Sequence, residues 1–139
     1  MNTYTWNQLE VGLSESFEVT VDEQMMKSFC MMTGDVNPLH NNEEFAKNKG
    51  FSDRVCFGML TASFLSTLAG VYLPGERSLI QAVDIKFVKP VFIGDSLNVS
   101  GTVAELNESV QQIVLKVVIV NQQKEKVLRG KMKIGLLDE

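Results

Sequence analysis

The spacing of hydrophobic positions changes once along this chain, near Pro74-Gly75. Before that point most patterns are helical, and after it they are those of strands. The exception is Ser14 to Thr20, where polar and apolar residues alternate and predict an edge strand. Thr20-Val21-Asp22-Glu23 then has the spacing of a capping box, so a helix is expected from about Val21 to Thr33.

The predicted helix stops at a turn-forming segment, Gly34 to Pro38. Glycine tolerates positive φ, and Pro38 keeps Asn37 out of the helical region, so this segment should be irregular. A short helix is expected from Asn42 to Lys49, ending at Gly50. Gly58 to Tyr72 contains no charged residue over about four helical turns. A helix of that composition should be enclosed by the rest of the protein.

Four segments after Pro74-Gly75 have strand composition: Ser78 to Val88, Ser96 to Leu106, Gln111 to Asn121 and Lys126 to Leu136. They follow one another too closely to leave room for crossover helices, so the sheet should be an antiparallel meander. The pattern therefore predicts an α+β fold in which one buried helix is wrapped by an antiparallel sheet.

Composition narrows the class of protein. With 139 residues, 45% of them hydrophobic and 22% charged, a single domain over residues 1–139 is expected. No window approaches the ~20 apolar residues of a membrane span, and Met1 to Gly12 lacks a secretory pattern. We therefore expect a cytoplasmic protein with no membrane partner.

Charge and cysteine content exclude further classes. The net charge of −4 leaves no basic surplus for phosphates, which disfavours a nucleic-acid partner. Cys30 and Cys56 have neither CxxC spacing nor companion histidines, so they are expected to be buried reduced thiols, and no metal site is predicted.

The chain contains a single histidine, His40, five positions after Asp35. Chemistry that needs a group titrating near neutrality must therefore use His40, a perturbed carboxylate or a perturbed cysteine. A tight turn can bring Asp35 and His40 to one pocket, where they could share a water molecule. The alternative is that Asp35 caps the turn and His40 is a solvated loop residue, and spacing alone favours this alternative.

Phe29 to Ala46 (FCMMTGDVNPLHNNEEFA) resembles the hydratase 2 motif of (R)-specific enoyl-CoA hydratases and MaoC-like dehydratases. Met32 is a minor departure from that motif. Arg54 to Ser66, Leu73-Pro74-Gly75 and Phe87 to Asp95 are similar to later blocks of the family, in the same order. The positions that match the motif are Thr33, Gly34, Asp35, Asn37, Pro38, Leu39, His40 and Ala46.

The resemblance covers about residues 8 to 136 and implies a hot-dog fold, a long central helix wrapped by a curved antiparallel sheet. It implies that Asp35 and His40 hold the water that attacks the β-carbon of a trans-2-enoyl thioester. Syn addition would give the (R)-3-hydroxyacyl thioester, and the reverse reaction would be a dehydration. The expected substrate is an acyl-CoA or acyl-carrier-protein thioester, and no cofactor is expected.

Gly58 is the expected oxyanion donor through its backbone N–H, because a helix N-terminus offers free N–H groups and a partial positive charge. The alternative is a glycine that serves only helix–sheet packing. Ser66 matches a serine that the family places near the catalytic pair, although serines in buried helices commonly bond the carbonyl one turn back. Asn37 is either a polar group of the pocket or a turn residue.

The main departure from the family is Phe57, where relatives often carry histidine. It leaves the catalytic pair intact but affects hydrogen bonding at the helix start and the choice of acyl chain. Phe57, Met59, Met31 and Met32 are the expected walls of a pocket for short to medium acyl chains, or else ordinary core residues.

Two other functions compete with hydration. Thioester hydrolases of this architecture usually place a carboxylate on the central helix, and Gly58 to Tyr72 has none. A non-catalytic acyl-CoA-binding module would be expected to have lost the aspartate or the histidine, and both are present. Whatever the activity, an isolated sheet of this kind exposes strand edges, so at least a homodimer is expected.

Overall fold

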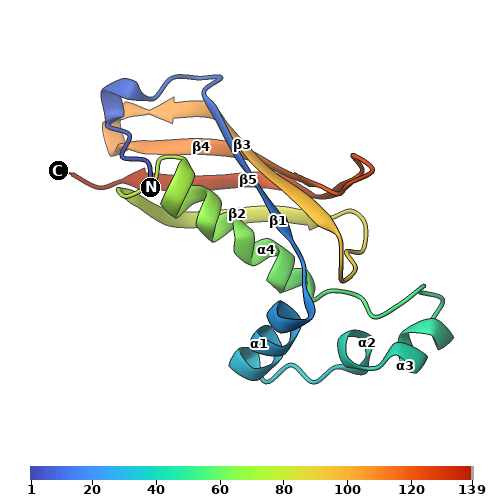
Figure 1. Ribbon diagram of the computed structural model, residues 1–139. Helices are drawn as coiled ribbons and strands as arrows, with labels where there is room; N and C mark the ends of the chain where they lie inside the picture. The colour runs from blue at the N-terminus through green and yellow to red at the C-terminus, as the bar shows by residue number, and fades with distance from the viewer. Residues whose placement is uncertain (139) are drawn as a thin grey trace.

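The computed structural model describes residues 1–138 as one antiparallel sheet with a helix across one face (Figure 1). The helices and turns are η1 (Trp6–Gln8), α1 (Glu23–Thr33), α2 (Pro38–Asn41), α3 (Glu43–Asn48), α4 (Gly58–Thr67), η2 (Leu68–Tyr72) and η3 (Glu108–Val110). The strands are β1 (Ser14–Thr20), β2 (Ser78–Phe87), β3 (Ser96–Asn107), β4 (Gln112–Val120) and β5 (Lys126–Leu136).

The strand order is β1-β3-β4-β5-β2, and every neighbouring pair is antiparallel. The predicted meander is confirmed for β3, β4 and β5 but is wrong for β2, which pairs with β5 instead of β3. The segment between β2 and β3 is no hairpin turn. It crosses the end of the sheet, where Val91 is buried and its carbonyl oxygen accepts a hydrogen bond from Cys56 N–H at 2.7 Å.

The first helix begins two residues later than predicted. Its N-cap is Asp22, whose carboxylate accepts a hydrogen bond from Met25 N–H at 2.8 Å, so the capping box at Thr20 is wrong. The reason is tertiary, because Val21 is fully buried and its backbone pairs with Asp95 and Gly94. The predicted end is confirmed: Gly34 caps the helix with φ of 74°, a left-handed conformation that favours glycine.

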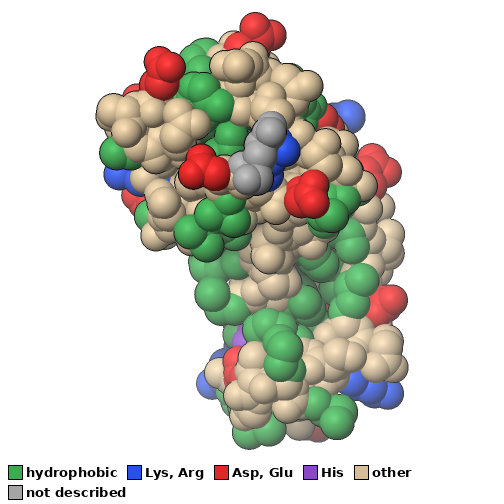
Figure 2. Space-filling view, turned by 90° about the vertical axis from the view of Figure 1, so that its left-hand side faces the viewer, with side chains coloured by type: hydrophobic (Ala, Val, Ile, Leu, Met, Phe, Trp, Pro, Cys, Tyr) green, Lys and Arg blue, Asp and Glu red, His purple; other side chains and the backbone are tan. Residues whose placement is uncertain are grey.

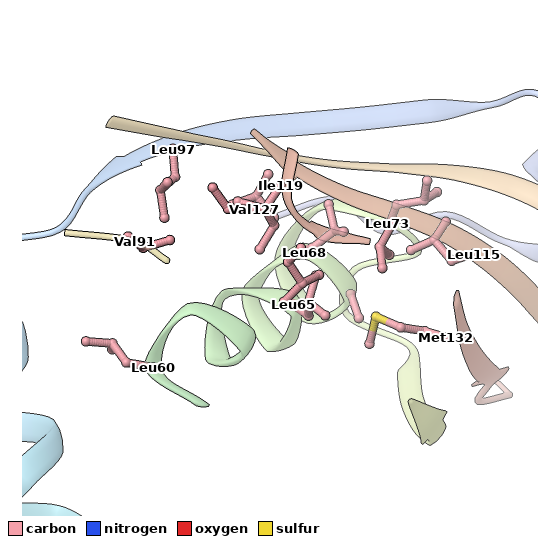
Figure 3. Close-up of a cluster of buried hydrophobic side chains, with 14 of the residues drawn as sticks. Leu60, Leu65, Leu68, Leu73, Val91, Leu97, Leu115, Ile119, Val127 and Met132 are labelled. Carbon is pink, nitrogen blue, oxygen red and sulfur yellow. The ribbon is translucent and has the colours of Figure 1, made fainter. Parts of the chain in front are cut away.

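The uncharged segment Gly58 to Tyr72 is helical throughout, and its last turn, η2, widens to a π-helix. Figure 3 shows Leu65 and Leu68 of this helix facing Leu115, Ile119 and Val127 of the sheet. The helix can lie close to the sheet because Gly101, on β3, has no side chain. A Cβ there would lie 2.9 Å from Leu115 and 3.0 Å from Leu68.

Enclosure of this helix is incomplete, which corrects the prediction that the rest of the chain covers it. Leu60, Leu65 and Leu68 are buried, but Met59 keeps 64% of its surface exposed. The three helices α1, α2 and α3 lie beyond the N-terminus of α4, at one end of the sheet (Figure 1). Figure 2 shows hydrophobic side chains gathered at the narrow part of the molecule between the sheet and this helical end.

Candidate active site

Asp35 lies in the segment between α1 and α2 and is held by hydrogen bonds to residues close to it in sequence. One carboxylate oxygen, Oδ1, accepts a hydrogen bond from Asn37 N–H at 3.1 Å, and Asp35 N–H donates to Thr33 Oγ1 at 3.2 Å. Cys30 Sγ donates to the Asp35 carbonyl at 3.2 Å. The carboxylate therefore has the turn-stabilising role that the sequence left open, and it is also exposed to the cavity described below.

His40 lies in α2 and is half-buried, so the interpretation as a solvated loop residue is wrong. Its Nδ1 is 2.7 Å from the carbonyl oxygen of Val55. A carbonyl can only accept, so Nδ1 carries the proton, and Nε2 of the neutral ring keeps a free lone pair. The imidazole therefore has a fixed tautomer with its basic nitrogen available.

Asp35 and His40 line one cavity of about 810 Å³, between the Asp35 segment, the start of α4 and the strand β2. The cavity is also lined by four other residues that the sequence analysis assigned to the site: Phe57, Gly58, Met59 and Ser66. The remaining lining residues, mostly apolar, are Phe29, Thr33, Ala62, Ser63, Leu65, Ile80, Val83, Ile85, Phe87 and Met132. The structure thus places a carboxylate and an imidazole at the edge of a mostly apolar chamber.

Met31, Met32 and Asn37 are not among the residues that line this cavity. Met31 and Met32 are 86% and 75% exposed, because they lie on the outer side of α1. The expectation that they form walls of the pocket is therefore not met within this chain. Asn37 caps α2, its side-chain oxygen accepting from Leu39 N–H at 2.9 Å, which is the turn role left open above.

Gly58 is the first residue of α4, and its N-cap, Phe57, provides no side-chain hydrogen bond. Within residues 1–138, the N–H of Gly58 has no hydrogen-bond acceptor. A Cβ at Gly58 would lie 3.3 Å from the Phe87 ring, which stands over the helix start. Gly58 thus combines a free N–H donor, the positive end of a helix and a backbone that no side chain of its own covers.

Ser66 faces the cavity, and its hydroxyl makes no hydrogen bond to another residue of the range 1–138. The structural alternative, a bond to a carbonyl of the preceding turn, is made instead by Ser63, which donates to the Leu60 carbonyl at 2.6 Å. A hydroxyl group is therefore free in a mostly apolar wall.

A second hollow of about 310 Å³ meets the first at His40, Gly58 and Phe87. It runs toward the end of the sheet, where Lys89 forms an ion pair with Glu125. The helix start and the imidazole therefore border both hollows.

An ion pair between Arg54 and Glu23 ties the segment before α4 to the first turn of α1. The hydrogen bond from the Arg54 guanidinium lowers the pKa of the Glu23 carboxyl and raises that of Arg54. This contact joins the two parts of the chain that carry Asp35 and Gly58.

The cysteines are both free thiols, Cys56 buried and Cys30 half-buried. Burial raises the pKa of the Cys56 thiol to about 11, so it is protonated and a poor nucleophile near neutrality.

Within residues 1–138, no group of three or more His, Cys, Asp or Glu side chains is placed to share a metal ion. In the same range, no helix has the length and apolar content needed to cross a membrane.

The strand β2 is the part of the site that sequence reasoning missed. Its alternate residues Val83, Ile85 and Phe87 line the cavity. Their period of two was visible in the sequence, but nothing local indicated that this strand would lie beside the start of α4.

Comparison with known proteins agrees with this architecture. Residues 7–126 match the family described as MaoC-like domain. The chain is 37% identical over 101 residues to a 3-hydroxybutyryl-CoA dehydratase of Methylorubrum extorquens, a match that covers 73% of this chain and 64% of that relative. It is 35% identical over 101 residues to an (R)-specific enoyl-CoA hydratase of Rhodospirillum rubrum, covering 73% and 70% of the two chains.

Solved structures show the same fold. The R-hydratase PhaJ1 from Pseudomonas aeruginosa superposes with a TM-score of 0.90 at 27% identity, covering 96% of this chain and 86% of that one. The (R)-hydratase from Aeromonas caviae superposes with a TM-score of 0.88 at 30% identity, covering 92% and 97%. The chain belongs to the MaoC-like dehydratase family and has its hot-dog fold. It spans less than two thirds of the length of the Methylorubrum relative.

Proposed function

We propose that this protein adds water to the double bond of a trans-2-enoyl thioester to give the (R)-3-hydroxyacyl thioester, and catalyses the reverse dehydration. The observation that carries the proposal is that Asp35 and His40 share a cavity with the free N–H of Gly58. The relatives named above are hydratases and dehydratases of such thioesters, which supports the same reaction class.

In the proposed reaction, one water molecule lies between the Asp35 carboxylate and Nε2 of His40. Both groups accept hydrogen bonds, so the water directs its two hydrogens to them and its oxygen to the β-carbon. As the C–O bond forms, the pair takes one proton from the water. The pair returns a proton to the α-carbon on the same face, so the thioester gains the elements of water by syn addition.

Negative charge develops on the thioester oxygen as the C–O bond forms, before the α-carbon receives its proton. The N–H of Gly58, at the positive end of α4, would stabilise that charge because it needs no rearrangement at the moment of reaction. The largely apolar chamber lined by Phe57, Met59 and β2 would hold the acyl chain. Phe57 and Met59 fill part of that space, which favours short to medium chains. The thioester is carried by coenzyme A or by an acyl carrier protein.

The test is loss of enoyl absorbance from crotonyl-CoA, with the product resolved on a chiral column. Asp35→Asn keeps the shape of the side chain but removes the base, so the rate should fall by roughly 10²-fold or more. His40→Gln should have a similar effect. Asp53→Asn, which changes a carboxylate outside the cavity, is the matched control. Wild-type turnover in folded Asp35→Asn would contradict the proposal, and release of free thiol without hydration would favour a thioester hydrolase.

A further inference from the structure

The candidate base, Asp35, lies on an exposed segment that has no regular secondary structure of its own. The residue before it, Gly34, adopts φ of 74° and is exposed as well. A base that shares one water molecule with His40 must be held to within about 0.5 Å, because a misplacement of about 1 Å can cost 10²-fold in rate. Contacts from outside the segment must therefore fix Asp35.

The hydroxyl of Thr33, the last residue of α1, forms two hydrogen bonds at once. It donates to the carbonyl oxygen of Phe29 at 2.7 Å and accepts from the backbone N–H of Asp35 at 3.2 Å. The first bond is common for threonine in a helix, where the hydroxyl reaches the carbonyl one turn back. It commits the hydroxyl hydrogen to Phe29, which leaves a lone pair for the amide of Asp35. The end of α1 therefore holds the backbone N–H of the candidate base.

The carbonyl and one carboxylate oxygen of Asp35 are held as well. Cys30 Sγ donates to the carbonyl at 3.2 Å, and Asn41 Nδ2 donates to it at 3.4 Å. The carboxylate oxygen Oδ1 accepts from Asn37 N–H at 3.1 Å. Within residues 1–138, the other carboxylate oxygen, Oδ2, accepts no hydrogen bond. Oδ2 is therefore the oxygen that remains for the water molecule.

The same turn of α1 also supports His40. The ring of Phe29 packs on the ring of Phe57, which packs on the imidazole, with centroid distances of 4.8 and 4.3 Å. Both phenylalanines are buried, so neither ring can shift without disturbing the core. Phe29 thus reaches His40 through its ring, and it reaches Asp35 through its carbonyl oxygen and the hydroxyl described above.

We propose that Thr33 is a positioning residue whose hydroxyl ties Asp35 to the end of α1 and so keeps the carboxylate in register with the imidazole. The inference rests on the proposed function, because this register matters only if both groups hold one water molecule. Thr33 also lines the cavity, but in this role it acts through Asp35 and not on the substrate.

The test begins with Thr33→Val, which replaces the hydroxyl with a methyl group in a side chain of nearly the same shape. Both hydrogen bonds are lost while the cavity wall is kept. For hydration of crotonyl-CoA, kcat should fall by roughly tenfold or more while KM changes by less than about twofold. Thr33→Ser keeps the hydroxyl and should restore kcat. Thr102→Val, which removes a hydroxyl that bonds Ser14 outside the cavity, is the matched control and should leave kcat unchanged.

A double-mutant cycle shows whether Thr33 acts through Asp35. In an Asp35→Asn background, Thr33→Val should have little further effect on kcat, because the base that the hydroxyl positions is already absent. In the protein with Asp35 intact, Thr33→Val should make the backbone N–H of Asp35 exchange faster with solvent deuterium, because that N–H has lost its acceptor. If Thr33→Val does not fold, Thr33→Ala removes the same hydroxyl and the same outcomes apply.

The inference is overturned if Thr33→Val keeps the wild-type kcat, if it lowers kcat equally in both backgrounds, or if Thr33→Ser is as slow as Thr33→Val. Failure of the proposed function gives a different result, namely no hydration by the wild-type protein. Exchange at the amide of Asp35 then tests the tie without turnover, and equal exchange in wild type and Thr33→Val overturns it.

Discussion

The imidazole of His40 packs against the ring of Phe57, with the ring centroids 4.3 Å apart and the planes tilted by 34°. The ring of Phe57 in turn packs on the ring of Phe29, with the centroids 4.8 Å apart, and Phe57 is only 1% exposed. The residue that departs from the family pattern is therefore the apolar support of the candidate catalytic histidine, and Val55 orients the same imidazole through its carbonyl oxygen.

Replacing Phe57 should change both substrate choice and stability. Phe57→Ala enlarges the cavity, so kcat/KM should shift toward longer acyl groups, by up to ~1–3 kcal/mol per methylene-sized change of fit. Loss of the buried ring should also cost about 3–5 kcal/mol of unfolding free energy, and Phe57→Leu should cost less. A kinetic series over acyl length measures the first effect and denaturant titration the second. Phe64→Leu, at a residue packed on the core outside the cavity, is the control. If kcat/KM depends on acyl length in the same way in folded, active Phe57→Ala as in the wild type, Phe57 does not limit the pocket.

Gly58→Ala separates the oxyanion role from a packing role. The new methyl would lie 3.3 Å from the Phe87 ring, and that side chain is 51% exposed and free to move, so the melting temperature should change little. The methyl would obstruct the approach of the thioester to the backbone N–H, so kcat/KM should fall by roughly 10²-fold. Gly70→Ala is the matched control, because its nearest neighbour, Ser78 Oγ, is 3.9 Å from the added Cβ. Equal activity of the two variants would assign Gly58 to packing alone.

The buried thiol of Cys56 should make stability depend on alkaline pH. Burial raises its pKa from 9.0 to about 11, so the unfolded chain loses this proton first as pH rises. The contribution is fully present below pH 9 and is lost between pH 9 and pH 11, by about 2 to 3 kcal/mol. Urea titrations should show that Cys56→Ala lacks this part of the decline, whereas Cys30→Ala retains it. Parallel curves for wild type and Cys56→Ala would contradict the assignment.

The exposed edge of β2 should be covered by a second copy of the chain. Leu79, Val83 and Phe87 are 51%, 48% and 51% exposed on this edge strand, and Met59 of the nearby helix is 64% exposed. Such an edge is normally paired or covered, so light scattering at micromolar concentration should give at least a dimer mass. Leu79→Lys, which leaves the cavity lining intact, should weaken the association. A monomer mass for the wild type would contradict the prediction.

Local features were predictable because they depend on neighbours in sequence. The end of α1 at Gly34, the helical span from Gly58 to Tyr72 and the strand segments after Pro74 follow from backbone preferences and periodicity, and the structure confirms them. The N-cap was missed by two residues, because burial of Val21 outweighed the capping-box spacing at Thr20.

The sequence by itself determined the two longest helices, the strands, the antiparallel character of the sheet and the placement of Asp35 and His40 in one short segment, since each depends on residues close together in the chain. The tertiary structure alone decided that β2 pairs with β5 and forms a wall of the cavity. It also decided that Met31 and Met32 face outward. These features depend on strand order, cross-strand register and helix orientation, which contacts between distant segments select and which no local pattern encodes.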